Sequence, residues 1–227
     1  MATPNTMRTH NARPCGLYKG ENQEGSMLDQ SIPYYNIIMK CPKNIEVHSV
    51  SLPAGYSLRF FEPGDEESWA AIEASVGEFA SQGEALAYFY EHYMSQKDEL
   101  AQRCLFAVDP HGMPVGTCTA WRDPKGGQTV NSLHWLAVCP QYQGRGLGKA
   151  LVSKVMDVYR GMDGPAPVYL HTQTWSHRAV GLYLKSGFRA LKSEAFSYYK
   201  NDYEQASAVL SCVMQADLYR LFISTAV

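Results

Sequence analysis

The sequence predicts an α+β fold in which helices flank a mixed β-sheet. Strand-like segments separated by turn signals fill much of the first half of the chain, whereas strand-like and helix-like segments alternate in the second half. A meander followed by strand–helix–strand–helix–strand is typical of a sheet with both antiparallel and parallel neighbours. With 227 residues, 45% of them hydrophobic, the chain is long enough for one domain with an extension.

The chain divides into three predicted parts: an N-terminal extension over residues 1–54, a compact domain over 55–200 and a C-terminal segment packed on it over 201–227. Residues 1–30 are polar and predict a mobile tail. Residues 32–39 are apolar and predict a short strand, a strap over the core or a flap over a pocket. Residues 203–214 favour a helix, and residues 218–223 fit a helix or a last strand.

Within the compact domain, apolar segments bounded by turn residues predict strands at 56–61, 104–108, 115–121, 133–138, 168–174 and 188–191. Apolar residues at helical spacing predict helices at 66–75, at 84–94, from 147 onward and at 177–186. Asp65 is the predicted N-cap of the first helix, and Gly187 the C-cap of the last. The strands at 133–138 and 168–174 are predicted to be parallel.

A glycine-rich turn joins the strand at 133–138 to the helix that begins at Leu147. Glycines allow close backbone approach, and a helix start offers free N–H donors, so this arrangement binds phosphate. A P-loop is excluded because Gln143 stands in place of its first glycine and Ala150 in place of its hydroxyl residue. The dinucleotide pattern is excluded because its third glycine would fall at Lys149. A glycine-rich connection without a ligand is the alternative.

The pattern that fits is Gln-x-x-Gly-x-Gly at Gln143, Gly146 and Gly148. With it the chain resembles the GNAT (GCN5-related) N-acetyltransferase family. A second family motif, Ala-x-x-Leu-Tyr-x-x-x-Gly-Phe, is matched within residues 177–188. The resemblance covers residues 58–191 and implies the GNAT acyl-CoA acetyltransferase fold, with about six to seven strands, acetyl-CoA as co-substrate and no metal.

The resemblance also implies where acetyl-CoA binds, namely where the two parallel strands part. The backbone groups expected to meet the thioester and the pantetheine arm are those of Leu136, Ala137 and Val138. The groups expected to cradle the pyrophosphate are the backbone amides of Gln143, Gly144, Arg145, Gly146, Leu147, Gly148 and Lys149. The side chains of Arg145 or Lys149 are expected at the adenosine phosphates or simply in solvent. Ser176 replaces an asparagine that often holds the pantetheine arm, and it also suits a helix N-cap.

Acetylation of an amine requires removal of a proton from the amine and donation of one to the leaving thiolate. Deprotonating an amine of pKa about 10.4 at pH 7 costs roughly 4.6 kcal/mol. By resemblance, Tyr183 is the expected acid. His134 is the expected base, because the arylalkylamine acetyltransferases carry histidines in this strand, and a core histidine is the alternative. Ideal alternation puts His134 on the face of Leu136 and Val138, opposite Ala137, although the family commonly has a bulge here.

The sequence does not identify the acceptor. Aromatic residues that are expected either in its pocket or in the core are Tyr34, Tyr35, Tyr88, Tyr90 and Tyr93. Glutamates that are expected either to bind a cationic acceptor or to solubilise helix surfaces are Glu73, Glu78, Glu84 and Glu91. We predict an N-acetyltransferase that acts on a primary amine of a small molecule. The alternatives are a peptide or protein acetyltransferase and a non-catalytic CoA-binding regulatory module.

Composition excludes several other classes of protein. A net charge of −2 and a pI near 6.4 give no electrostatic case for nucleic acid or an anionic membrane. No apolar run approaches the roughly 18 residues needed to span a bilayer. Six scattered cysteines without a Cys-x-x-Cys pair predict reduced thiols and a cytoplasmic protein. A homodimer is left open.

Overall fold

The computed structural model describes residues 28–42, 50–164 and 166–227. Its main elements are β1 (Asn36–Cys41), β2 (Ser57–Phe60), α1 (Glu66–Ser75), α2 (Gln82–His92), α3 (Lys97–Arg103), β3 (Cys104–Val108), β4 (Pro114–Lys125), β5 (Gln128–Val138), α4 (Leu147–Met162), β6 (Val168–Gln173), α5 (His177–Lys185), β7 (Arg189–Ala190), α6 (Tyr203–Val213) and α7 (Ala216–Thr225). The tail expected over residues 1–30 lies outside the described residues as far as residue 27.

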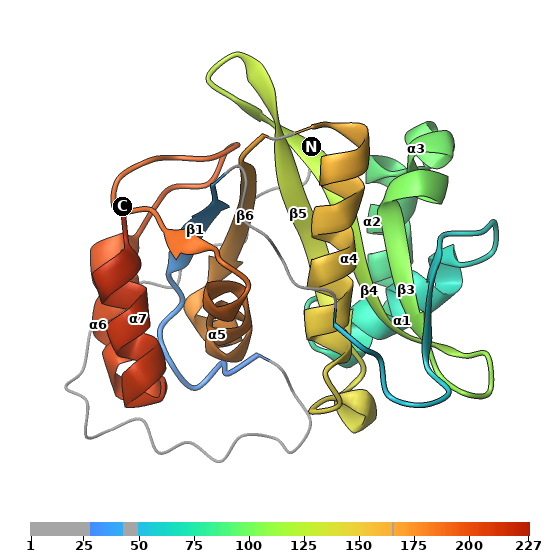
Figure 1. The fold of residues 1–227 in the computed structure, drawn as a ribbon, viewed down its shortest axis with the longest axis horizontal. Helices are drawn as coiled ribbons and strands as arrows, with labels where there is room; N and C mark the ends of the chain where they lie inside the picture. Colours follow the sequence, from blue (N-terminus) through green and yellow to red (C-terminus); the bar gives the residue numbers. More distant parts are fainter. Residues whose placement is uncertain (1–27, 43–49, 165) are drawn as a thin grey trace.

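The strands form one mixed sheet in the order β2-β3-β4-β5-β6-β1-β7 (Figure 1). Every neighbouring pair is antiparallel except β5 and β6, which are parallel. The predicted α+β class with a mixed sheet is therefore confirmed. The parallel pair is connected through α4, as the alternation of strand and helix signals predicted.

Strand β1 lies inside the sheet, between β6 and β7, rather than over it. It pairs with β6 along its whole length, from Asn36 opposite Gln173 to Cys41 opposite Val168. Its apolar side chains at residues 37–39 are fully buried, and burial of this run stabilises the pairing. Of the alternatives for the apolar segment, the structure shows a strand. This part of the predicted N-terminal extension therefore contributes to the core.

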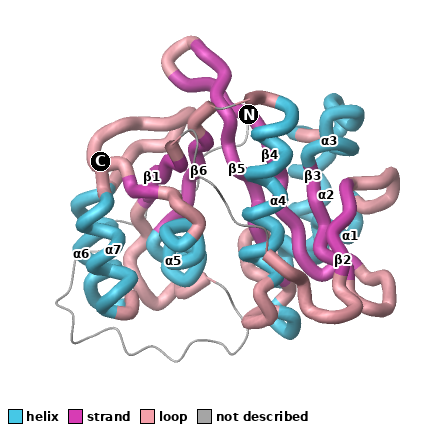
Figure 2. Tube along the Cα trace, viewed as in Figure 1, coloured by secondary structure: helices cyan, strands magenta, loops and turns pink. Residues whose placement is uncertain are grey.

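Two layers of helices cover the sheet (Figures 1 and 2). Helix α4 packs on β3, β4 and β5 from one side, whereas α1 packs on β4 and β5 and shares a separate apolar cluster with α2 and α3. Helices α6 and α7 lie beside β1 and β7. This arrangement gives the centre of β5 two different environments, the α4 cluster and the α1–α2 cluster.

Several local predictions are confirmed and others are wrong. Helix α1 has the predicted bounds, Gly187 follows α5 with φ of 89°, and α7 is the helical alternative for the end of the chain. Asp65 makes no side-chain cap bond and instead accepts hydrogen bonds from Arg59 at 2.7 Å and the Glu62 amide at 2.7 Å. Cys212 is disulfide-bonded, so the expectation of reduced thiols is wrong there.

Candidate active site

Strand β5 bulges at its centre. Thr117 of β4 pairs with Ala137 and Thr119 pairs with His134, so a single β4 residue faces two residues of β5. Trp135, within this bulge, has φ of 51°, a backbone conformation that a tryptophan rarely adopts. The bulge interrupts the alternation of side chains along β5.

The bulge changes which face of the sheet His134 occupies. Leu136 and Val138 join the cluster under α4, whereas Trp135 and Ala137 join the cluster under α1 and α2. The His134 ring contacts a member of that second cluster through a hydrogen bond. Ideal alternation therefore gave the wrong face for His134, because the extra residue shifts the pattern by one position.

Strands β5 and β6 part immediately after they begin to pair. Their pairing consists of Asn131 with Val168 and Ser132 with Tyr169. Beyond Ser132, the edge of β5 that faces β6 has no strand partner in the described part of the chain, and this edge includes the backbone of residues 136–138. The parallel strands thus part on the way to the glycine turn, as the family resemblance implied.

The glycine turn leads directly into α4. Gly144 and Gly146 have φ of 73° and 82°, which explains why glycine stands at these positions, and a side chain added to either would meet no atom within 4 Å. Gly146 is the N-cap of α4 and provides no side-chain cap. The first amides of the helix therefore receive no side-chain cap, which suits an anion.

Two residues of the turn have structural roles that the sequence did not reveal. The Gln143 side chain donates a hydrogen bond to the Val138 carbonyl at 2.9 Å, which fixes the turn to the end of β5. A side chain at Gly148 would approach Leu182 of α5 to 3.3 Å, so glycine allows α4 and α5 to pack closely. These contacts leave the backbone amides of the turn available.

The two cations of the turn differ in their surroundings. Arg145 donates hydrogen bonds to the Tyr56 hydroxyl at 3.2 Å and to the Gln141 carbonyl at 3.3 Å, and its guanidinium lies over the Tyr142 ring. Lys149 is exposed at the start of α4. Arg145 can turn toward a phosphate at the turn at little cost in free energy, because its present hydrogen bonds are long and exposed. Lys149 can do the same because it is exposed.

Tyr183 lies on the inner face of α5, with only 6% of its surface exposed. Its ring packs edge-on against Phe188, and its hydroxyl has no hydrogen-bond partner within the described ranges. Burial raises the pKa of Tyr183 well above its ordinary value, and negative charge at Cys118, Glu78 and Glu73 raises it further. The hydroxyl therefore keeps its proton at neutral pH and can donate it.

His134 is the centre of a hydrogen-bonded chain. Its Nδ1 lies 2.8 Å from the Tyr93 hydroxyl, and its Nε2 makes a short contact with the Asp123 carboxylate. Burial raises the pKa of Asp123, but the hydrogen bond and charge of His134 outweigh this effect and the pKa is lowered. Both ring nitrogens thus have partners, and Asp123, which lies beyond the predicted strand at 115–121, is a member that the sequence analysis missed.

The remaining aromatic candidates separate into different environments. Tyr93 is buried, Tyr88 stacks on His92 and packs against Trp135, and Tyr90 is 49% exposed. His171 of β6 stacks on the ring of Tyr199, and burial lowers the pKa of this histidine to about 3. These aromatic side chains therefore pack largely against other rings.

The structure places Ser176 and two of the glutamates on helices or at their ends. Ser176 is the N-cap position of α5 but makes no side-chain cap bond. Glu84 accepts a hydrogen bond from the Ala80 amide at 3.1 Å while its own amide is capped by Ser81, which makes it part of the start of α2. Glu91 is exposed on α2.

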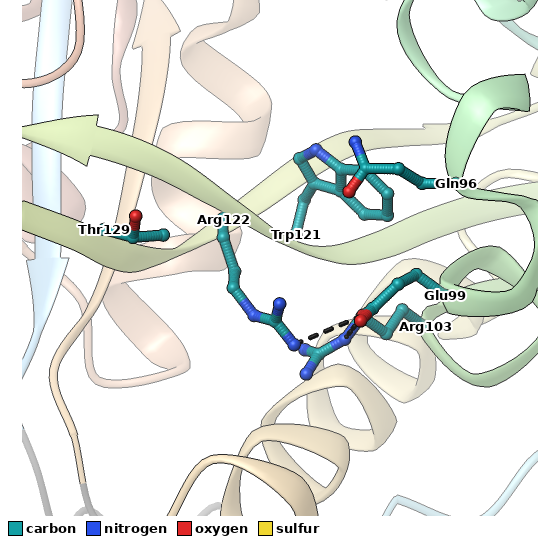
Figure 3. Close-up of a pocket in the computed structure, with 6 residues that line it drawn as sticks. All are labelled: Gln96, Glu99, Arg103, Trp121, Arg122 and Thr129. Atoms are coloured by element: carbon teal, nitrogen blue, oxygen red, sulfur yellow. Dashed lines mark hydrogen bonds and ion pairs between the residues drawn. The ribbon is translucent and has the colours of Figure 1, made fainter.

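A small cavity of about 170 Å³ lies elsewhere, between α3 and the β4–β5 hairpin (Figure 3). Its lining includes Glu99, which pairs with Arg103 at 2.7 Å and with Arg122 at 3.2 Å. Arg103 also pairs with Asp163 at 2.8 Å. Two arginines and two carboxylates balance each other here, and no residue predicted from the sequence lines this cavity.

No group of side chains in the described ranges could hold a metal ion. Across the same residues, no helix is both long enough and apolar enough to cross a membrane. The arrangement around β5 therefore consists of an anion-binding turn, an opened strand edge and titratable side chains close to it.

Comparison with known proteins agrees with this geometry. Two curated relatives are each named mycothiol acetyltransferase. One, from Salinispora arenicola, is 32% identical over 155 residues, which cover 66% of this chain and 50% of the relative. The other, from Arthrobacter sp., is 34% identical over 147 residues, covering 63% and 45%. The chain thus spans about half the length of the curated relatives it matches.

A solved structure, described as a GCN5-related N-acetyltransferase from Sphaerobacter thermophilus, superposes with a TM-score of 0.53 at 25% identity, covering 70% of this chain and 49% of that one. The family model described as Acetyltransferase (GNAT) family matches residues 67–188, which include the bulge, the glycine turn and Tyr183. This match covers more than half of the sequence, and the chain therefore belongs to the GNAT family of acetyltransferases.

Proposed function

We propose that this chain is an acetyl-CoA-dependent N-acetyltransferase that acetylates a primary amine of a small molecule. The observation that carries this proposal is the uncapped start of α4, with Gly144 and Gly146 in left-handed conformations, beside the opened edge of β5. The similarity to proteins named mycothiol acetyltransferase supports a small-molecule acceptor.

The residues at this position fit acetyl-CoA. Backbone amides from Gln143 to Lys149 offer donors to a pyrophosphate, and no side chain obstructs them at Gly144 or Gly146. The unpaired edge at residues 136–138 offers backbone groups to a pantetheine arm, in the manner of an added strand. When bound, acetyl-CoA supplies an acetyl group activated as a thioester.

Two side chains are proposed to manage protons. Tyr183 holds a proton on a hydroxyl that has no competing partner in the described part of the chain, and it is suited to protonate a leaving thiolate. His134 cannot accept a proton directly without losing a partner, so we propose that it acts through the Tyr93 hydroxyl. In that relay Tyr93 passes its proton to Nδ1 of His134 and takes up a proton from the acceptor amine.

Thermal unfolding with added nucleotide tests the cofactor assignment. Acetyl-CoA at about 100 times its dissociation constant is expected to stabilise the protein by roughly 2.7 kcal/mol, whereas ATP at the same concentration has no effect. Equal stabilisation by both ligands, or by neither, would contradict the proposal.

Thiol release across a panel of amines then tests the acid. Tyr183→Phe removes only the hydroxyl, so it is expected to lower kcat by about 100-fold or more. Stabilisation by acetyl-CoA is expected to stay unchanged in this variant. An unchanged kcat would remove Tyr183 from the mechanism and leave the cofactor assignment standing.

A further inference from the structure

Glu73, on the inner face of α1, is a buried carboxyl with an unsatisfied oxygen. The residue is 1% exposed, and its Oε1 has no hydrogen-bond partner within the described ranges. No ion pair to Glu73 is formed by any lysine, arginine or histidine of those ranges. A carboxylate removed from water without a partner is strongly destabilising, and a fold retains such a group readily when a ligand supplies the partner.

The end of α1 brings a second carboxyl to the same place. Gly77 has φ of 88°, and its amide bonds to the Ala74 carbonyl at 3.1 Å, while the Glu78 amide bonds back to the Glu73 carbonyl at 3.3 Å. This pair of reversed bonds is a Schellman motif, which turns the chain sharply at the glycine. Glu78 therefore folds back over the turn of helix that carries Glu73.

The two carboxyls differ in their access to water. Glu73 is buried, whereas Glu78 is exposed at the surface. Desolvation nevertheless raises the pKa of Glu78, and a hydrogen bond from Gln173 at the end of β6 opposes this shift. Glu73 is thus the buried member of the pair, and Glu78 is the member that solvent reaches.

Both carboxyls raise the pKa of Tyr183, the proposed acid. Negative charge at Glu78 and at Glu73 contributes to the raised pKa of Tyr183 on α5. Glu78 also acts on Tyr34, which precedes β1 and packs against Trp175; burial and this charge raise the pKa of Tyr34 to about 12. The charges at the end of α1 thus influence titratable groups both on α5 and in the segment before β1.

We propose that Glu73 and Glu78 form the subsite that binds the ammonium group of the acceptor, so that the acceptor is a primary amine that arrives as a cation. An ammonium carries three donors and no acceptor, which matches ionised carboxylates, because these only accept hydrogen bonds. Alkylamines are mostly charged at neutral pH. The inference rests on the proposed function, because it assigns the acceptor side of the same site.

The test compares wild type with Glu73→Gln, Glu78→Gln and, as a matched control on the neighbouring helix, Glu91→Gln. Each protein is first titrated with acetyl-CoA by thermal shift, which reads the proposed function independently of any amine. Saturated with CoA, each is then titrated calorimetrically with spermidine and 2-phenylethylamine, which are cations at pH 7.5, and with p-anisidine, which is neutral there.

We expect the dissociation constants of the two cations to rise by about 10- to 100-fold in Glu73→Gln and by less in Glu78→Gln, since a hydrogen bond to a charged group is lost. Glu91→Gln should bind like wild type, and every variant should retain its shift with acetyl-CoA. Absence of cation binding by wild type, equal binding of p-anisidine, or unchanged binding in Glu73→Gln would overturn the subsite. Loss of the acetyl-CoA shift in wild type would instead overturn the proposed function.

Discussion

Two titratable groups on the α1–α2 side of the sheet contrast sharply. His134 has a partner on each ring nitrogen, Tyr93 and Asp123, and its side chain is about 20% exposed. Glu73 is more deeply buried, yet its Oε1 has no partner within the described residues. His134, which water can reach, has its hydrogen bonds supplied by the protein, whereas the Oε1 of Glu73, which water cannot reach, has none.

This difference separates a group that stabilises the fold from one that awaits a ligand. Satisfied polar networks rigidify a structure, whereas an unpaired buried charge lowers its stability. Removing a partner of His134 should therefore destabilise the protein, and removing the charge of Glu73 should stabilise it. Variants at the two positions are expected to move stability in opposite directions.

The largest effect is expected from Asp123→Ala. This change leaves the Nε2 of His134 without its acceptor, and a hydrogen bond to a charged group contributes about 1.5–3 kcal/mol. The melting temperature should fall by about 4–10 °C in a scanning calorimeter. Asp217→Ala is the control, because it breaks an ion pair that is exposed on α7 and should change stability by less than about 0.5 kcal/mol. Similar losses of stability in both variants would show that the hydrogen bonds of His134 stabilise the fold no more than an exposed ion pair does.

An effect of the opposite sign, which grows with pH, is expected from Glu73→Gln. Burial, with the charge of Glu78, raises the pKa of Glu73 in the folded state well above its value in the unfolded chain. Between these two values the folded protein binds more protons, so the stability of wild type falls as pH rises from about 4.5. The variant lacks this loss. Its free energy of unfolding, relative to that of wild type, should therefore increase by about 1.4 kcal/mol per pH unit until the folded pKa is passed. Urea unfolding at pH 5, 6, 7 and 8 measures the difference, and parallel curves would mean that Glu73 is paired.

The smallest effect is expected from Gly77→Ala, which perturbs the turn between the two carboxyls. Alanine at φ of 88° should destabilise the protein by about 1–2 kcal/mol. It should also weaken the binding of spermidine, because Glu78 shifts away from Glu73. Gly83→Ala is the control: its added carbon would meet only the Ser81 Oγ at 3.9 Å inside α2, and it should be neutral or stabilising by up to about 1 kcal/mol. A loss of stability without weaker binding would separate the turn from the subsite.

Local patterns predicted much of this molecule because their causes are local. The periodicity of α1 and α4 and the glycines of the turn gave the correct elements. The position of β1 was beyond the sequence, since its partners at residues 168–173 and 189–190 are distant in the chain and pairing of this kind leaves no local signal. Helix α3 was missed because its seven residues carry five that are polar or charged.

The site divides in the same way. Tyr183 and the turn were found through motifs, and their tests remain to be made. The face of His134 was misassigned because a bulge of one residue reverses alternation. Asp123 was overlooked because β4 extends beyond the strand predicted at 115–121. Glu73 was one of four candidate glutamates, and only the packing of α1 on β4 and β5 distinguishes it from the other three.

The insertion of β1 between β6 and β7 also sets the timing of folding during synthesis. Its partner strand begins roughly 130 residues later, which corresponds to about 6–26 s of elongation at about 5–20 residues per second. Throughout that interval an apolar strand has two unsatisfied edges, a condition that favours pairing with other chains. Release of the nascent protein in an unaggregated form therefore depends on shielding of residues 36–41 until residues 168–190 emerge from the ribosome.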